Sequence, residues 1–247
     1  LVAPNQVIVS SQDNESLQSL KDQYAIRIAD DNRQVAAEAD ILFLAVKPNI
    51  YNVVIDEIKT TVKEKIVIVT IAAGKSLSDI EERFGRKLKV VRAMPNTPAL
   101  VGEGMTGICA NEVVNVAELT DVKNIFDSFG RSEMVSEYMM DAVTGVSGSS
   151  PALVFMFIES LADGAVRGGM PRQQAYKFAA QAVLGSAKMV LETGKHPGEL
   201  KDMVCSPGGT TIEAVAELEK NGFRSAVISA VQTTIDKSIA MSKPKEN

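Results

Sequence analysis

The sequence predicts an α/β protein, with a doubly wound parallel sheet in the first part of the chain and an all-helical part after it. Short β-rich runs alternate with helical stretches over residues 1–138, which is typical of a parallel sheet covered by helices. The runs at 41–46 and 66–71 are apolar throughout, as expected of strands buried on both faces. From about Asp141 the β pattern stops and nearly every stretch has helical character. We therefore expect one domain over residues 1–138 and a second over 139–247.

The predicted strands are short, and the segments between them carry helix signals. Four strands are well marked, at 7–9, 41–46, 66–71 and 88–94. Two weaker ones follow near 107–110 and 133–135. A capping box over Ser78 to Glu81 predicts the start of the helix between the third and fourth strands. Ligands of a doubly wound sheet bind outside the carboxyl ends of its strands. The chemistry is therefore expected just after these runs.

Small residues and prolines follow three of the predicted strands. The three segments are Ala45-Val46-Lys47-Pro48, Ile71-Ala72-Ala73-Gly74 and Met94-Pro95-Asn96-Thr97-Pro98. Each one alone is also typical of an ordinary strand-to-helix turn, and Lys47 alone is typical of a solvated lysine. Together they predict a crevice lined by rigid backbone, the shape that a flat cofactor ring needs.

A Rossmann-type sheet normally opens with a strand, a G-x-G-x-x-G turn and a helix, and this chain contains no such motif. Its beginning, residues 1–5, is typical of a loop entering a second strand. We expect about 25 residues, with the first strand and the Gly-rich turn, to lie upstream, so that the dinucleotide-binding domain is incomplete at its N-terminus. After Val9, Ser10 and Ser11 replace the acidic residue that selects NAD. Their hydroxyls are compatible with a 2′-phosphate, although no arginine accompanies them.

The second part of the chain predicts long apolar helices. Ser150 and Pro151 are a cap and first-turn pair, and the helix that they open is apolar on all sides until Glu159. Glycines or prolines separate the later helices. We expect the helix that Pro151 opens to end at 168–169, a second helix to run over 171–193 and end at Gly194, and a last helix to run over 223–241. A helix that is apolar all round must be surrounded. The excess of apolar faces therefore predicts a dimer that shares one helical core.

The stretch 196–213 predicts a binding site for an anion. Thr210 and Glu213 have the spacing of a capping box, and an apolar helical run follows them. Gly208 and Gly209 have no side chain to keep a ligand from the backbone, so N–H groups, threonine hydroxyls and the helix dipole can converge on a carboxylate or phosphate. The stretch alone is also explained by a tight turn before a capped helix.

The composition excludes several function classes. A net charge of −5 without any basic block argues against nucleic-acid binding. Cys109 and Cys205 are far apart and lack metal-ligand spacing, so we expect no metal site and a cytoplasmic location. We expect Cys205 to be a small buried apolar residue, and the only histidine, His196, to cap a loop rather than act as the general acid. No uninterrupted apolar stretch is long enough to predict a membrane span, and no signal peptide is visible.

Four stretches together resemble the pyrroline-5-carboxylate reductase family, namely 45–48, 94–98, 141–152 and 196–213. The resemblance covers essentially the whole chain in the right order, and the pattern at 196–213 is specific to that family. It implies an oxidoreductase of proline biosynthesis, with hydride transfer from NAD(P)H to the imine carbon of 1-pyrroline-5-carboxylate, giving L-proline. It also implies NADPH as the cofactor with NADH as the alternative, and a homodimer with interlocked helical domains that in many members forms a decamer.

The resemblance also implies roles for individual residues. Ser11 and Asn32 match contacts on the adenosine side of the cofactor. The cofactor crevice is matched by Ala45, Val46, Lys47, Pro48, Ile71, Ala72, Ala73 and Asn96. The site for the substrate carboxylate is matched by Ser206, Gly208, Gly209, Thr210 and Thr211. Thr144 matches the hydroxyl that helps with the proton, and Glu137 matches another substrate-site position.

Two alternatives stay open at this point. One is a relative of the β-hydroxyacid dehydrogenases, which resemble one another in using a lysine on the first interdomain helix, but the stretch 145–169 contains none. The other is a non-catalytic protein that keeps the helical half as a dimerisation scaffold or regulator. The missing Gly-rich turn favours the second alternative, and saturable binding of NADPH would exclude it.

Overall fold

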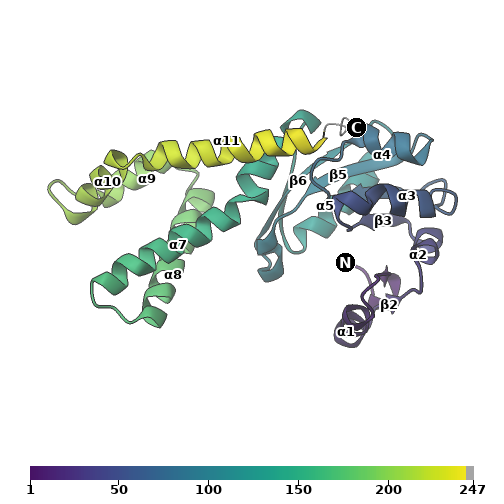
Figure 1. Ribbon diagram of the computed structural model, residues 1–247, viewed down its shortest axis with the longest axis horizontal. Coiled ribbons are helices and arrows are strands. Elements are labelled where there is room, and N and C mark those ends of the chain that lie inside the picture. Colours follow the sequence, from purple (N-terminus) through teal and green to yellow (C-terminus); the bar gives the residue numbers. More distant parts are fainter. Residues whose placement is uncertain (243–247) are drawn as a thin grey trace. The chain divides into compact units, whose positions relative to one another are not determined.

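The structure is a computed structural model that describes residues 1–242, and it divides into two compact units (Figure 1). The first unit contains Leu1–Gly148 together with the chain from Thr234 onward, and the second contains Ser149–Thr233. The expected domain boundary between residues 138 and 139 does not coincide with this division into units. The domain boundary between residues 138 and 139 therefore stays a prediction.

The first unit is built on a five-stranded sheet of order β3-β4-β5-β6-β7. Its strands are β3 (Ile41–Leu44), β4 (Val67–Thr70), β5 (Lys89–Met94), β6 (Gly104–Ala110) and β7 (Gly130–Met134). A separate two-stranded parallel sheet joins β1 (Ile8–Val9) to β2 (Arg27–Ile28). All the strands anticipated from the sequence are present within a few residues, but β2 was not predicted.

One strand pair departs from the parallel arrangement that the sequence predicts. β5 and β6 run antiparallel, with Arg92 opposite Cys109, whereas all other pairs are parallel. The connection between them is a short 3-10 turn, Thr97–Val101, followed by Gly102 in the left-handed region. A parallel crossover needs a dozen or more residues and usually a helix, so this short connection can only return the chain antiparallel.

Helices cover both faces of the five-stranded sheet (Figure 1). The helices of the first unit are α1 (Asn14–Tyr24), α2 (Asn32–Glu38), α3 (Tyr51–Ile58), α4 (Leu77–Phe84), α5 (Val116–Asp127) and α6 (Met140–Val143). Buried residues of α2, α3 and α4 form the core on one face, and Val122 and Phe126 of α5 form the core on the other. Every residue of β4 is buried, as its continuous apolar run predicts.

The helix starts differ from two of the predicted caps. The cap of α4 is Ser76, whose hydroxyl accepts the Asp79 N–H while the Asp79 carboxylate accepts the Ser76 N–H, so the capping box lies two residues before the predicted one. The predicted box at Thr210 and Glu213 is also wrong. Thr210 is already the first residue of its helix, and the cap is Gly209, which has no side chain to donate or accept.

The second unit is helical, as expected. It contains α7 (Ser150–Arg167), α8 (Arg172–Thr193), α9 (Pro197–Val204), α10 (Thr210–Lys220) and the beginning of α11 (Phe223–Ser242). Ser150 is the first residue of α7 rather than its cap, which is Ser149. Gly168 and Gly194 end α7 and α8 at the predicted places, and Gly194 does so in the left-handed conformation (φ +65°).

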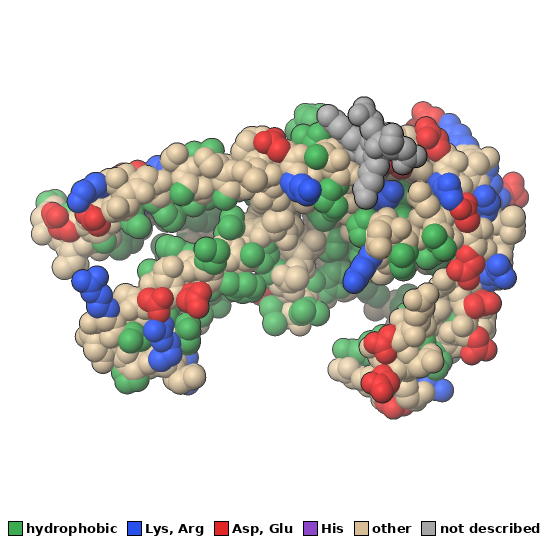
Figure 2. Space-filling model, viewed as in Figure 1, with side chains coloured by type: hydrophobic (Ala, Val, Ile, Leu, Met, Phe, Trp, Pro, Cys, Tyr) green, Lys and Arg blue, Asp and Glu red, His purple; other side chains and the backbone are tan. Residues whose placement is uncertain are grey.

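The apolar helices of the second unit leave much of their apolar surface uncovered. The buried core of this unit contains only Ala162, Ala175 and Ala179 among the described residues. Phe155 and Met156 of α7 are 63% and 65% exposed, and green apolar side chains are visible along these helices in Figure 2. The expectation that α7 is surrounded is therefore not met within a single chain. Such a surface is typical of a subunit contact.

Candidate functional site

The predicted cofactor segments follow the carboxyl ends of β3 and β4, and one buried side chain connects these two ends. The hydroxyl of Tyr51, on α3, lies 2.6 Å from the Leu44 carbonyl and 2.7 Å from Thr70 Oγ1. Leu44 is the last residue of β3 and Thr70 is the last residue of β4. The Tyr51 side chain is fully buried, so the phenol fixes the points from which Ala45–Pro48 and Ile71–Ala73 leave the sheet.

Replacing Tyr51 with phenylalanine is expected to lower the free energy of unfolding at pH 7 by about 1–3 kcal/mol, because the buried Leu44 carbonyl loses its donor and the buried Thr70 hydroxyl loses its partner. Burial raises the pKa of Tyr51 from its ordinary value of 10.0 to about 12, so the folded state favours the neutral phenol. The preference of the folded state for the neutral phenol corresponds to about 3 kcal/mol of stability. This stability is fully present below pH 10 and is lost as the pH rises through 12. The stability advantage of the unaltered protein should therefore shrink between pH 10 and 12. Urea unfolding of both proteins at a series of pH values measures this, and a constant difference would contradict it.

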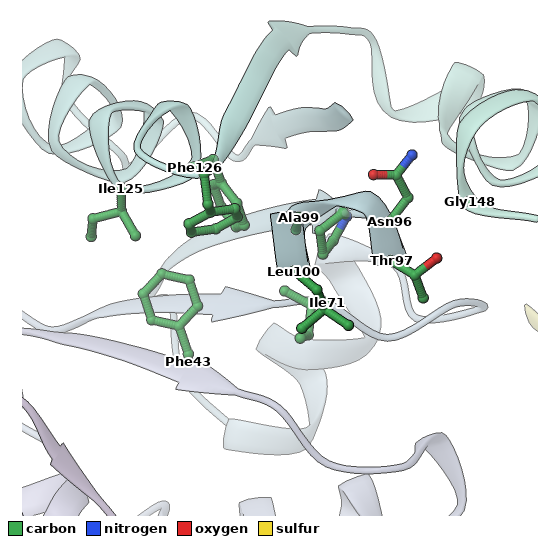
Figure 3. Close-up of a pocket in the computed structure, with 11 residues that line it drawn as sticks. Phe43, Ile71, Asn96, Thr97, Ala99, Leu100, Ile125, Phe126 and Gly148 are labelled. Atoms are coloured by element: carbon green, nitrogen blue, oxygen red, sulfur yellow. The ribbon is translucent and has the colours of Figure 1, made fainter. Parts of the chain in front are cut away.

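An apolar cavity of about 640 Å³ lies beside the ends of β3, β4 and β5. Its wall includes Phe43 of β3, Ile71 after β4, Asn96 after β5 and Phe126 of α5, and Figure 3 shows these side chains around a common space. A volume of this size, with mostly apolar walls and a few polar groups, is typical of a site for a small organic ligand. Of the predicted crevice residues, Ile71 and Asn96 line this cavity, whereas residues 45–48, Ala72 and Ala73 do not. The apolar walls fit a flat ring such as a nicotinamide at this edge of the sheet.

The two residues predicted on the adenosine side, Ser11 and Asn32, make separate hydrogen bonds. Asn32, the first residue of α2, accepts a hydrogen bond from the Ser10 hydroxyl (2.8 Å) and donates one to the Glu57 carboxylate (2.9 Å). The hydroxyl of Ser11 is exposed and accepts the Asp13 N–H at 3.1 Å. Arg33, the next residue on α2, donates to the Glu57 carbonyl at 3.2 Å. The sequence reasoning found no arginine to accompany the serines, and the structure places this one next to Asn32.

The Glu137 carboxylate contacts the start of α4 and the buried Arg92 of β5. One carboxylate oxygen accepts the N–H of Leu77, the first residue of α4, at 2.7 Å, and it lies 3.4 Å from a guanidinium nitrogen of Arg92. Arg92 is 4% exposed, and its Nε and Nη2 have no hydrogen-bond partner among the described residues. Burial and the neighbouring Glu137 raise the pKa of the Cys109 thiol to about 11, so this cysteine stays neutral.

Thr144 begins a π-helical turn, Thr144–Gly148, between α6 and α7. Its side chain is buried, and its hydroxyl donates to the Met140 carbonyl at 2.9 Å. Turns of this kind are rare and often occur at functional sites. Because the hydroxyl proton is engaged, the oxygen lone pairs of Thr144 remain to accept a hydrogen bond.

In the second unit, the predicted carboxylate residues form a turn that ends in an uncapped helix. Gly208 is in the left-handed region (φ +66°), and the Gly209 N–H donates to the Ser206 carbonyl at 3.0 Å. No side chain caps α10, whereas Asn115 caps α5 and Ser76 caps α4. The first N–H groups of α10 therefore lack a side-chain cap, and the helix dipole at this end favours negative charge.

Two cap residues near this turn are also defined. His196 Nδ1 accepts the Gly198 N–H at 3.0 Å, so His196 caps α9, as the sequence predicts. Cys205 is partly exposed, so the expectation that it is buried is wrong, because the turn after α9 leaves it near the surface. Neither side chain is placed for proton transfer by these contacts.

The sequence reasoning missed Tyr51 and Arg92. Tyr51 looks like an ordinary apolar position of an amphipathic helix, and only its hydroxyl contacts distinguish it. Arg92 interrupts the apolar run of β5, where every other residue from Val90 to Met94 is an apolar buried one. A charged residue inside a buried strand was the available signal.

The chain is similar to known proteins along nearly its whole length. A family model described as "Pyrroline-5-carboxylate reductase dimerisation" matches residues 137–241, and one described as "NADP oxidoreductase coenzyme F420-dependent" matches residues 2–74. The pyrroline-5-carboxylate reductase of Escherichia coli K12 is 54% identical over 242 residues, which is 98% of this chain and 90% of that protein. Among solved structures, the Coxiella burnetii pyrroline-5-carboxylate reductase has a TM-score of 0.90 and 35% identity over 98% of this chain and 90% of that one. The Plasmodium falciparum pyrroline carboxylate reductase, solved with NADP bound, has a TM-score of 0.88 and 34% identity over 97% and 88%.

A Rossmann-type sheet followed by a helical part, together with these matches, identifies an NAD(P)-dependent oxidoreductase. Within that class, the chain belongs to the pyrroline-5-carboxylate reductase family. Neither the dehydrogenase alternative nor the scaffold alternative is favoured by these relatives.

Proposed function

We propose that this protein reduces 1-pyrroline-5-carboxylate to L-proline, and that the observation carrying this function is the likeness to named reductases along nearly the whole chain. The matched length includes the strand ends of the first unit and the glycine turn before α10. Each of these parts has a geometry that suits one half of the reaction. The first offers an apolar space for a flat ring, and the second offers free N–H groups for a carboxylate.

The substrate carboxylate is assigned to the N-terminus of α10. There it would accept hydrogen bonds from the first-turn N–H groups and the hydroxyls of Ser206, Thr210 and Thr211, while Gly208 and Gly209 let it approach the backbone. Holding this group fixes the orientation of the imine ring, and orientation alone supplies a large part of the rate when the reacting carbon is already electrophilic. This accounts for a reductase without an obvious acid–base pair.

The imine nitrogen is assigned to Thr144. Its hydroxyl proton is held by the Met140 carbonyl, so Thr144 Oγ1 would accept the N–H of the protonated imine and keep that proton in place. Glu137 is kept as a further substrate-site residue, although one of its oxygens is bound by Leu77 and lies near Arg92. When bound, the nicotinamide cofactor supplies the hydride.

The cofactor is assigned to the crevice residues Ala45, Val46, Lys47, Pro48, Ile71, Ala72 and Ala73, with Ser11 and Asn32 on the adenosine side. Asn96 lies at the same edge of the sheet, but both ends of its side-chain amide are bonded within the protein. We propose NADPH rather than NADH, with support from Arg33 beside Asn32, which adds a positive charge for a 2′-phosphate, and from the related structure with NADP bound. NADH stays the alternative cofactor.

The apolar surface of the second unit is assigned to a homodimer, with a decamer as the larger assembly. The helical stretch from Glu137 to Arg167 would be long and apolar enough to cross a membrane by length and composition alone. The dimerisation family model covers the same residues, and we therefore assign their exposed apolar side chains to a subunit contact rather than to lipid. The free cysteines Cys109 and Cys205 support a cytoplasmic location.

Two measurements on the same sample test this function. Titration of NADPH, followed by its fluorescence, should show saturable binding, and addition of 1-pyrroline-5-carboxylate should then consume NADPH and form L-proline in equal amounts. Absence of saturable binding would favour a scaffold. Binding of NADPH without turnover of this imine would point to a different oxidoreductase.

A further inference from the structure

Asn96 uses both ends of its side-chain amide to connect segments that are distant in the sequence. Its Oδ1 accepts the Met105 N–H at 2.9 Å, and its Nδ2 donates to the Ser147 carbonyl at 3.0 Å. Asn96 follows β5, Met105 belongs to β6 and Ser147 belongs to the π-helical turn. In Figure 3 the amide nitrogen of Asn96 is directed toward the turn that carries Gly148.

The turn held by Asn96 is the one that begins with Thr144. A π-helical turn is intrinsically less favourable than an α-helical one, so it persists where the surrounding structure fixes it. On its apolar side, Val143 lies so close to β6 that a Cβ on Gly107 would be 2.8 Å from its Cγ1. On its polar side, the bond from Asn96 to the Ser147 carbonyl ties the turn to the end of β5.

We propose that Asn96 is a positioning residue, which acts on the reaction by holding the Thr144–Gly148 turn rather than by contacting the cofactor. This inference rests on the proposed function, because Thr144 is the group that it positions. It also differs from the role that the family resemblance implies, in which Asn96 belongs to the cofactor crevice. The amide oxygen and one amide hydrogen of Asn96 are already used within the protein.

Asn96→Asp is the sharpest variant for this inference. The aspartate has the same shape and keeps an acceptor for the Met105 N–H, but it replaces the donor to the Ser147 carbonyl by an oxygen that repels it. A displacement of about 1 Å in a reacting group costs up to about 100-fold in rate, so we expect kcat to fall about 10- to 100-fold. The Kd for NADPH and the KM for the imine should stay within about threefold, because the Asn96 amide is bonded within the protein and is assigned to neither ligand.

Asn111→Asp is the matched control. Asn111 also uses both ends of its amide, at the other end of β5: it accepts the Val90 N–H at 3.2 Å and donates to the Leu88 carbonyl at 2.7 Å and to the Glu81 carboxylate at 2.9 Å. Its replacement should lower the melting temperature at least as much as Asn96→Asp does, because the new carboxylate also faces Glu81, while leaving kcat within about twofold. If Asn96→Asp does not fold, Asn96→Ala, which removes both bonds without adding charge, is measured in its place.

Three results separate positioning from the alternatives. In a Thr144→Val background the effect of Asn96→Asp on kcat should largely disappear, because the two residues act through one turn. An unchanged effect in that background, an unchanged kcat, or a rise in the NADPH Kd that accounts for the loss would each overturn the inference.

Hydrogen exchange of the segment 140–150 provides a readout that does not depend on activity. Exchange should become faster in Asn96→Asp and not in Asn111→Asp, and equal exchange in both would also overturn the inference. If the unaltered protein binds NADPH without reducing the imine, the proposed function fails. This exchange measurement then decides by itself whether Asn96 holds the turn.

Discussion

Replacing Thr211 with aspartate is expected to raise the KM for 1-pyrroline-5-carboxylate by about 100-fold or more while leaving the protein folded. The new carboxylate would stand in the first turn of α10, where the substrate carboxylate is assigned. Two like charges about 4 Å apart repel by a few kcal/mol in a partly buried site, and about 1.4 kcal/mol corresponds to a factor of ten. An acidic residue near a helix N-terminus stabilises the helix by up to about 1 kcal/mol, so the melting temperature should not fall.

Thr211→Asn is the neutral control for this change. It keeps a polar side chain of the same size as aspartate, and we expect its KM to rise less than about tenfold. Steady-state kinetics with the imine as the varied substrate, together with NADPH titration, compares the two variants. A KM for Thr211→Asp within threefold of the unaltered protein would show that the carboxylate binds elsewhere, and an equal rise in the NADPH Kd would show a general disturbance.

Replacing Gly130 with alanine is expected to lower the free energy of unfolding by about 3 kcal/mol or more. Gly130 pairs with Gly104 in the register of β6 and β7, and a Cβ at residue 130 would lie 2.1 Å from the Gly104 carbonyl oxygen. The added Cβ would clash with backbone atoms of the five-stranded sheet, and these cannot move without breaking the pairing of β6 with β7. Total stabilities of about 5–15 kcal/mol leave little margin for such a loss.

Gly85→Ala separates this clash from the effect of a left-handed backbone. Gly85 ends α4 with φ +70°, and a Cβ there would meet nothing within 4 Å, so its replacement should cost only about 1–2 kcal/mol. Urea unfolding of both variants measures the difference. If Gly130→Ala lost no more stability than Gly85→Ala, the close approach of β6 and β7 at this point would be wrong.

The elements that depend on local pattern were predictable from the sequence. Continuous apolar runs mark β3 and β4, and the glycine after Thr193 marks the end of α8, because burial and left-handed backbone each demand particular residue types. The direction of β6 was not predictable in this way. It follows from the short connection Thr97–Val101, and the apolar pattern of a strand carries no information on its direction.

The caps show how local patterns mislead. Both Ser76 and Ser78 precede acidic residues at capping-box spacing, and only the backbone conformation selects Ser76. At α10, the Thr210 and Glu213 pattern predicted a satisfied helix start, whereas the cap is Gly209 and the N–H groups are open. The wrong prediction concerned the feature that suits this turn to binding, because a side-chain cap would compete with the ligand for the same N–H groups.

The sequence by itself determined the class of fold, the family, and the segments from which the site is built, because these depend on residue types at fixed positions along the chain. Only the tertiary structure decided how single side chains are used. The Tyr51 phenol connects two strand ends, Glu137 meets Arg92 across 45 residues, and Asn96 holds the turn of Thr144 across 51 residues. Such hydrogen bonds depend on the packing of distant segments, which no local spacing or periodicity encodes.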